Sequence, residues 1–275
     1  MSENTERLSN FFNTIYLDYL YVVIVTIYFF KLIFMPFNSQ DLVARSLLTS
    51  LNVKTSVYYQ NRIPHDIPVI VIGNHRSFLD APLLISAVPY SLRIATHHYM
   101  GQTPGLREFI QLLGCFPLAE KQQKQQHFFA TAQNLLASRQ WVGLFPEGTQ
   151  PMIKPTQPHK VGSFHRGFAH LAYRMPIERL MVLPVAIASL SESNYPTIPI
   201  RWLSNFDASE PLFKREGSHP MIVYHRVNLL FGRPYLINAD KKEQYQGKQA
   251  KYLVNSLTNY CQTQIAQLLK EGCYE

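Results

Sequence analysis

Charged side chains are scarce in this 275-residue chain: Asp, Glu, Lys and Arg make up 16% of it, against about 25% in an ordinary soluble domain. Cysteine is scarcer, with three residues and no Cys-x-x-Cys spacing. That excludes a disulfide framework and a cysteine zinc site, and predicts reduced thiols in a cytosolic compartment. Lys and Arg form no compact run, so we expect no nucleic-acid partner.

Apolar residues are abundant instead, at 47% of the chain, and 13% of residues are aromatic. This composition excludes intrinsic disorder, while a mean hydropathy of -0.09 excludes a polytopic membrane protein. The formal charge of +8 predicts an anionic partner, such as lipid headgroups or a phosphorylated small molecule.

The longest apolar run lies between residues 11 and 37, with no charge between Asp18 and Lys31. Spanning a bilayer takes about 20 mostly apolar residues, and the run reaches that length only with a charged residue near one end. A helix lying in one leaflet, a single-pass anchor and a buried core helix all remain open. Since aromatic rings favour the membrane interface, we prefer the first, and predict a membrane-association segment over residues 1–60 and an α/β domain over 61–275.

Short apolar runs alternate with helical spacing after residue 61. The runs typical of buried strands are Pro68–Ile72, Trp141–Phe145 and Met181–Ile187, with weaker candidates at Ile222–His225 and Leu229–Phe231. Helical spacing covers Ser77–Ala87, Pro104–Leu113, Gln122–Ser138, Gly167–Arg174 and the amphipathic segment Lys248–Lys270. The alternation predicts an α/β fold with a largely parallel central sheet flanked by helices.

The first strand leads into a loop that contains His75, Ser77 and Asp80. Ser77 and Asp80 have the spacing of a helix capping box, which predicts a helix beginning at Phe78. Asp80 in the first turn can fold back toward the imidazole, fix its tautomer and leave the second ring nitrogen as a base. A turn histidine beside a helix cap is the structural alternative.

The second strand leads into Phe145-Pro146-Glu147-Gly148-Thr149. Gly148 permits close backbone approach to a ligand, and Glu147 can accept hydrogen bonds from hydroxyl groups. Alone, such a turn is usually a plain surface turn. The combination of this turn with the earlier Asn-His-x-Ser-x-x-Asp loop, in this order, is specific.

With both motifs, the chain resembles the glycerolipid acyltransferases of the lysophosphatidic acid acyltransferase family, over about residues 65–240. Leu113–Leu118 and Val182–Ala186 are similar to two further family blocks. The resemblance implies that His75 and Asp80 are catalytic, and that Glu147, Gly148 and Thr149 hold the acceptor. It implies acyl transfer from acyl-CoA or acyl-carrier protein to a lysophospholipid hydroxyl in phospholipid biosynthesis, at the cytoplasmic face of a membrane. No metal or cofactor is expected, because the thioester donor is already activated.

The chain departs from the family where arginines are expected to bind the acceptor's phosphate. Glu120 and Gln150 stand at those positions. We predict that Arg76, Lys121 and Arg166 bind substrate. Lys121, Lys154, Lys160 or Arg166 could replace the missing arginine contact. Lysophosphatidate is the preferred acceptor, and the alternatives are a phosphate-free or glycosylated lipid and a catalytically silent lipid-binding relative.

Overall fold

The apolar run near residue 70 becomes the middle of a three-layer structure, because its side chains alternate between two buried faces. The computed structural model describes residues 40–102, 106–118, 124–148, 156–199 and 218–273. In it, every residue of β2 (Val69–Gly73) is buried. Val69 and Val71 join one hydrophobic core, whereas Ile70 and Ile72 join the other. A strand that is apolar on both faces needs helices on both sides of its sheet.

The remaining elements follow the predicted alternation of strands and helices. The helices are α2 (Gln40–Ser50), α3 (Asp80–Ala87), α4 (His98–Gln102), α5 (Leu106–Leu112), α6 (Lys124–Ala137), α8 (Gly167–Arg174), α10 (Ala239–Glu243) and α11 (Gly247–Gly272), with a 3-10 turn at Gln60–Arg62. The other strands are β1 (Lys54–Tyr58), β3 (Leu92–Thr96), β4 (Phe116–Pro117), β5 (Trp141–Leu144), β6 (Leu180–Pro199), β7 (Ser218–Phe231) and β8 (Tyr235–Ile237).

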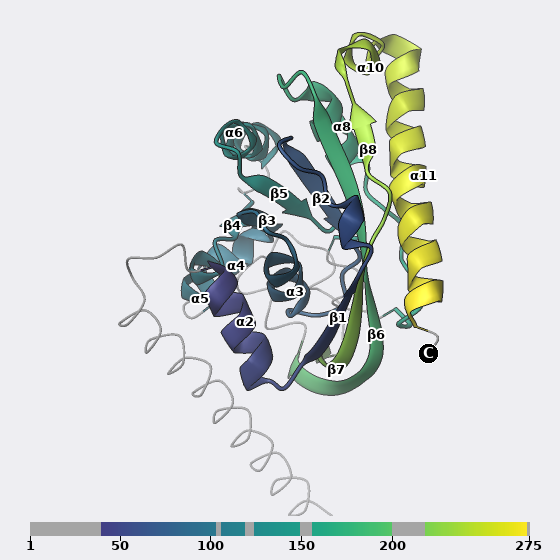
Figure 1. Cartoon of the computed structure of the whole chain (residues 1–275). Helices are drawn as coiled ribbons and strands as arrows, with labels where there is room; N and C mark the ends of the chain where they lie inside the picture. The colour runs from purple at the N-terminus through teal and green to yellow at the C-terminus, as the bar shows by residue number, and fades with distance from the viewer. Residues whose placement is uncertain (1–39, 103–105, 119–123, 149–155, 200–217, 274–275) are drawn as a thin grey trace, which may run out of the picture.

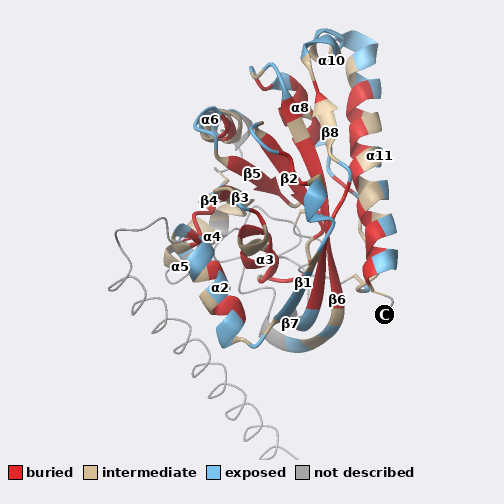
Figure 2. Ribbon diagram, viewed as in Figure 1, coloured by how far each residue is buried: buried red, intermediate tan, exposed pale blue. Residues whose placement is uncertain are grey.

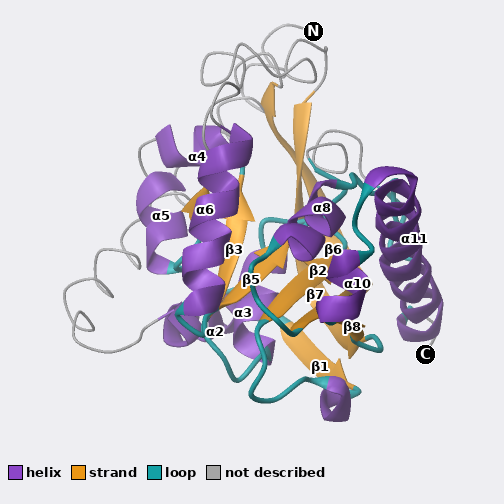
Figure 3. Ribbon diagram, turned by 90° about the horizontal axis from the view of Figure 1, so that it is seen from above, coloured by secondary structure: helices purple, strands orange, loops and turns teal. Residues whose placement is uncertain are grey.

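The strands form one sheet in the order β1-β7-β6-β2-β5-β3-β4, and β8 pairs with β6. Strand β6 is antiparallel to β7 and β8, and the other pairs are parallel, which confirms the largely parallel sheet. Helices α2 and α3 pack on one face, while α6, α8 and α11 pack on the other (Figures 1 and 3). Figure 2 shows the buried residues in the strands and in the sheet-facing sides of these helices.

The predicted boundary after residue 60 lies too late in the chain. Strand β1 pairs with β7 in the central sheet, and buried residues of α2 belong to the same core as α3. The described residues of the predicted membrane segment therefore belong to the α/β domain. The apolar run itself falls within residues 1–39, outside the described residues. In the ranges that the structure describes, no helix is long and apolar enough to cross a membrane.

Strands β6 and β7 are longer than predicted and form a hairpin that runs past the carboxyl end of β2. The two weak strand candidates near residues 222 and 229 join into β7 alone. The pairing register shifts between Ser189 and Ser191, and again between Ser191 and Glu192. Such bulges bend a strand and redirect its side chains, and here they lie beside the loop that follows β2.

Candidate active site

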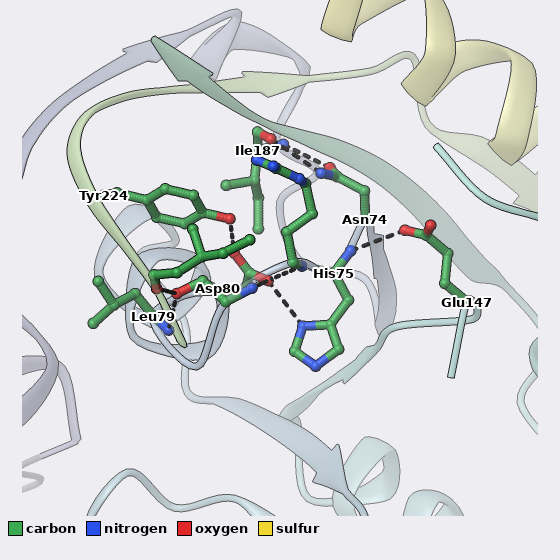
Figure 4. Close-up of polar contacts among 10 residues, drawn as sticks. Asn74, His75, Leu79, Asp80, Glu147, Ile187 and Tyr224 are labelled. Atoms are coloured by element: carbon green, nitrogen blue, oxygen red, sulfur yellow. Dashed lines mark hydrogen bonds and ion pairs between the residues drawn. The ribbon is translucent and has the colours of Figure 1, made fainter. Parts of the chain in front are cut away.

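Asn74 fixes the loop that follows β2 to the neighbouring strand β6. Its side chain is 1% exposed and exchanges two hydrogen bonds with the backbone of Ile187, at 3.0 and 2.8 Å (Figure 4). These two bonds continue the pairing between β2 and β6 by one further residue. They satisfy one donor and one acceptor of the buried Asn74 amide. The next residue, His75, therefore leaves the sheet from a fixed point.

His75 and Asp80 make the contact that their spacing predicts. His75 Nδ1 lies 2.8 Å from Asp80 Oδ2, and the imidazole is 20% exposed whereas the carboxylate is 0% exposed. With Nδ1–H donating to the carboxylate, the lone pair lies on Nε2. Figure 4 shows that nitrogen turned away from Asp80. The Phe145 ring stacks on the imidazole, with centroids 4.5 Å apart.

Asp80 receives three further hydrogen bonds. The backbone N–H groups of Arg76 and Ser77 donate to Oδ2 at 2.6 and 2.8 Å, and the Tyr224 hydroxyl donates to Oδ1 at 2.9 Å. Four donors match an ionised carboxylate, which only accepts. The predicted capping box is formed only in part: Asp80 Oδ2 accepts from Ser77 N, but Ser77 Oγ accepts from Leu79 N at 3.1 Å and not from Asp80 N. Regular helix begins at Asp80 rather than at Phe78.

Tyr224 is a functional residue that the sequence analysis missed. It lies on β7, is 0% exposed, and has a pKa raised well above its ordinary value by burial and then by the charge of Asp80. The hydroxyl therefore keeps its proton and donates to Asp80. Nothing local to the chain around residue 224 signals this role, because its partner is 144 positions away.

Arg76 binds the protein rather than standing free for substrate, contrary to our prediction. Its guanidinium is 3% exposed and forms two hydrogen bonds with the Glu192 carboxylate, at 2.6 and 2.8 Å. Burial alone would lower the pKa of Arg76, but the Glu192 contact outweighs it and the pKa is raised. Burial likewise opposes the charge of Glu192, yet the Arg76 hydrogen bond holds the pKa of Glu192 below its usual value. Both groups stay charged.

Glu147 also makes contacts that differ from the prediction. We expected it to hold substrate hydroxyls, but it is 1% exposed, and its oxygens accept from His75 N at 2.9 Å and Gly162 N at 2.6 Å. A Cβ on Gly162 would lie 2.7 Å from Oε2, so a larger residue there would have to displace the Glu147 carboxylate from this position. Burial raises the pKa of Glu147 against the effect of these hydrogen bonds. Glu147 thus joins the β5 turn to the His75 loop.

The other predicted substrate-binding residues are placed less completely. Gly148 adopts φ 66, which favours glycine, and its N–H bonds to Phe145 O at 3.1 Å. Lys121 and Thr149 lie outside the described residues. Arg166 is exposed at the start of α8, and no described hydrogen bond or ion pair joins its side chain to the His75 loop. The roles of these four residues remain predictions.

The fold and the His75 loop together define a class of protein. Loops that follow parallel strands at their carboxyl ends form the usual ligand sites of open α/β sheets. Here such a loop holds an imidazole oriented by a buried carboxylate, with Nε2 free of protein partners among the described residues. This arrangement fits an enzyme that removes a proton from a hydroxyl group.

Comparison with known proteins identifies the type of reaction that this class of enzyme catalyses. Residues 54–188 match the model of the acyltransferase family, so the chain contains an acyltransferase domain and the protein is an enzyme of this type. The matched range contains His75, Asp80 and Glu147. No curated protein sequence matches the chain.

A solved structure shows the same fold. The chain resembles the crystal structure of the 1-acyl-sn-glycerophosphate (LPA) acyltransferase PlsC from Thermotoga maritima. The TM-score is 0.54 at 18% identity, covering 91% of this chain and 94% of that one. At this identity the likeness concerns the arrangement of the backbone.

Proposed function

We propose that this enzyme transfers a fatty acyl group from a thioester, either acyl-CoA or acyl-carrier protein, to the free hydroxyl of lysophosphatidate. The observation that supports it best is the His75–Asp80 pair, whose contact distance is 2.8 Å. The acyltransferase match covers both residues. The activity in the name of the PlsC structure, together with the motifs of residues 75–80 and 145–149, leads us to this acceptor.

The reaction balances with the side chains that are present. Nε2 of His75 takes the proton of the acceptor hydroxyl as its oxygen attacks the thioester carbonyl. The carbon–sulfur bond then breaks, the acyl group stays on the oxygen as an ester, and the imidazolium returns the proton to the thiolate. Asp80 stabilises the imidazolium between these steps. A thiol with a pKa near 8.5 is a good leaving group.

A phosphate-free acceptor is the second candidate. Gln150 and Glu120 occupy positions where the resemblance predicts arginines, and the guanidinium of Arg76 already binds Glu192. A guanidinium binds phosphate with two charge-assisted hydrogen bonds, which a glutamine cannot replace. A hydroxylated or glycosylated lipid would not need these contacts.

The central test replaces the base. His75→Ala should lower kcat by about 10²- to 10⁴-fold with any acceptor, because positioned base catalysis contributes about that much. The control is His127→Ala, since His127 is exposed on α6. Full turnover in His75→Ala would rule out the proposed base, and the absence of any acyl transfer by the wild type would favour a silent lipid-binding relative.

An acceptor panel separates the two candidate substrates. Purified protein is given acyl-CoA or acyl-carrier protein with lysophosphatidate, with its dephosphorylated monoacylglycerol, and with a glycosylated lipid. We expect the highest kcat/KM with lysophosphatidate. A preference for either phosphate-free lipid would transfer the proposal to the second candidate.

We further propose that residues 1–36 attach the enzyme to the cytoplasmic face of a membrane, on the basis of the apolar run in that segment. Deleting Met1–Pro36 should abolish cosedimentation with phospholipid vesicles while near-ultraviolet circular dichroism of the α/β domain is retained. Unchanged cosedimentation would assign membrane binding to another part of the chain.

A further inference from the structure

A second concave site lies between α8 and the first turns of α11, which run side by side (Figures 1 and 3). Its volume is about 400 Å³, within the range of about 300–1,000 Å³ for small-molecule sites. Arg166, His170 and Arg174 follow one stripe of α8, and Lys251 faces them from α11. Tyr245 completes this side of the cleft, with its hydroxyl 2.6 Å from His170 Nδ1.

The positive charges of this cleft are not balanced by the protein. Within the described ranges, no carboxylate lies within ion-pair distance of Arg166, Arg174 or Lys251. Arg166 and Arg174 lie two turns apart on α8 and Lys251 lies on α11, so the cleft gathers like charges from two helices. Burial lowers the pKa of His170, and the charges of Arg174 and Arg166 lower it further, as expected in a positive electrostatic field. An anion that entered the cleft would relieve this repulsion.

Further hydrogen-bond donors face the same space. Gly247, the first residue of α11, lines the cleft, and the preceding Gln246 makes no side-chain cap. The first N–H groups of α11 are therefore available to an anion. Asn255 also lines the cleft, and its buried Oδ1 has no hydrogen-bond partner in the described structure. Its amide can turn to present N–H groups instead.

One end of the cleft lies at Arg166, the residue that follows a contact of α8 with the Glu147 turn. His165 N donates to Pro146 O at 2.8 Å, so the start of α8 adjoins the turn that holds Glu147. Arg174 lies eight residues beyond Arg166, about 12 Å farther along the helix axis. In lysophosphatidate the phosphate is only a few bonds from the hydroxyl that reacts. In acyl-CoA the whole pantetheine arm separates the nucleotide phosphates from the thioester.

We propose that this cleft binds the phosphate groups of the CoA nucleotide, a role that rests on the proposed function. In this proposal Arg174 from α8 and Lys251 from α11 contact the phosphate groups. A concave site of this volume accommodates a nucleotide, whereas the docking of an acidic carrier protein requires a broad exposed surface.

Direct binding tests the site without any turnover. Isothermal titration with adenosine 3′,5′-bisphosphate should give a measurable Kd for the full-length wild type. Arg174→Gln and Lys251→Gln should each weaken it by about 10- to 100-fold, since each removes a charge-assisted contact. Lys248→Gln is the matched control, because Lys248 is exposed on the same turn of α11 and does not line the cleft. Equal affinity in all four proteins would overturn the proposal.

Kinetics then connect the site to the donor. Two donors that carry the same acyl group are compared by kcat/KM: the acyl-CoA, and the acyl N-acetylcysteamine thioester, which lacks the nucleotide. The preference for acyl-CoA should fall about tenfold or more in Arg174→Gln, because KM for acyl-CoA rises. An unchanged preference overturns the proposal while leaving the acyltransferase function intact. Nucleotide binding by a protein that transfers no acyl group would keep the site and reject the function. If Arg174→Gln bound phosphatidate vesicles more weakly than wild type but kept its affinity for the nucleotide, the cleft would be a lipid site and the proposal would be overturned.

Discussion

The loop that holds His75 and the cleft between α8 and α11 both contain several charged groups, but the protein balances them differently. In the loop, Asp80 has four donors, and Arg76 has Glu192. In the cleft, the cations of α8 and α11 have no described carboxylate partner. Satisfied groups hold one geometry before substrate arrives, whereas unbalanced charges are stabilised when a ligand arrives. This difference distinguishes the residues that position the reacting groups from the residues that we propose bind the ligand.

The largest expected effect comes from the balanced loop. Asp80→Asn should lower kcat by about 10²- to 10⁴-fold, because the amide cannot stabilise the imidazolium and turns donors toward backbone N–H groups. Steady-state kinetics with acyl-CoA measure this, and thermal unfolding identifies the folded fraction. A kcat within about threefold of wild type would show that His75 needs no acid partner.

The ion pair beside the loop should matter for stability. Glu192→Gln leaves the guanidinium of Arg76, 3% exposed, without its counter-charge, so the free energy of unfolding should fall by about 3 kcal/mol. Replacing both residues in Arg76→Met/Glu192→Met should recover most of it, because a buried pair often contributes little over apolar packing. Denaturant titration of the single and double variants measures the coupling. Additive losses would show that the two side chains act independently.

The same pair predicts a pH dependence. The pKa of Glu192 is lowered from 4.5, so its contribution to stability is present above that pH and is lost as the pH falls below it. Glu147, with a raised pKa, acts in the opposite direction. Unfolding free energies measured between pH 6 and pH 3 should therefore fall less steeply in Glu192→Gln than in wild type. An equal slope would assign acid sensitivity to other carboxylates.

The smallest effect is expected in the cleft. Without ligand, Arg174→Gln should change the free energy of unfolding by no more than about 0.5 kcal/mol, and in the stabilising direction, because it removes like-charge repulsion. A clear loss of stability in denaturant titration would show that Arg174 has a structural partner, and would remove the contrast between the two regions.

The sequence predicts the parts of this molecule that depend on neighbouring residues. The bounds of α8 agree with the predicted Gly167–Arg174, because a full amphipathic period lies within the helix. The contact between His75 and Asp80 was predictable for the same reason, since both belong to one loop. Strand β1 was missed because it lies at the edge of the sheet and its residues are mostly exposed, so it has no apolar run.

The errors concern contacts between distant segments. Glu147 and Arg76 are polar residues in a ligand-binding loop, and both were predicted to bind substrate. Their partners, Gly162 and Glu192, are 15 and 116 positions away. Which buried polar group meets which partner depends on strand order and on the bulges of β6. Neither is encoded in local spacing.

Tyr224 and Glu192 are directly paired across the β6–β7 hairpin, and both reach the His75 loop. If β7 paired with β6 one residue out of register, Tyr224 and Glu192 would no longer lie on the same face of the sheet. Such a molecule would lose a support of the general base, and it would also move buried residues of β7 such as Val227 and Leu229 away from the core. The register of this hairpin is therefore a condition for activity as well as for folding, because the same pairing places the core residues of β7 and the support of the general base.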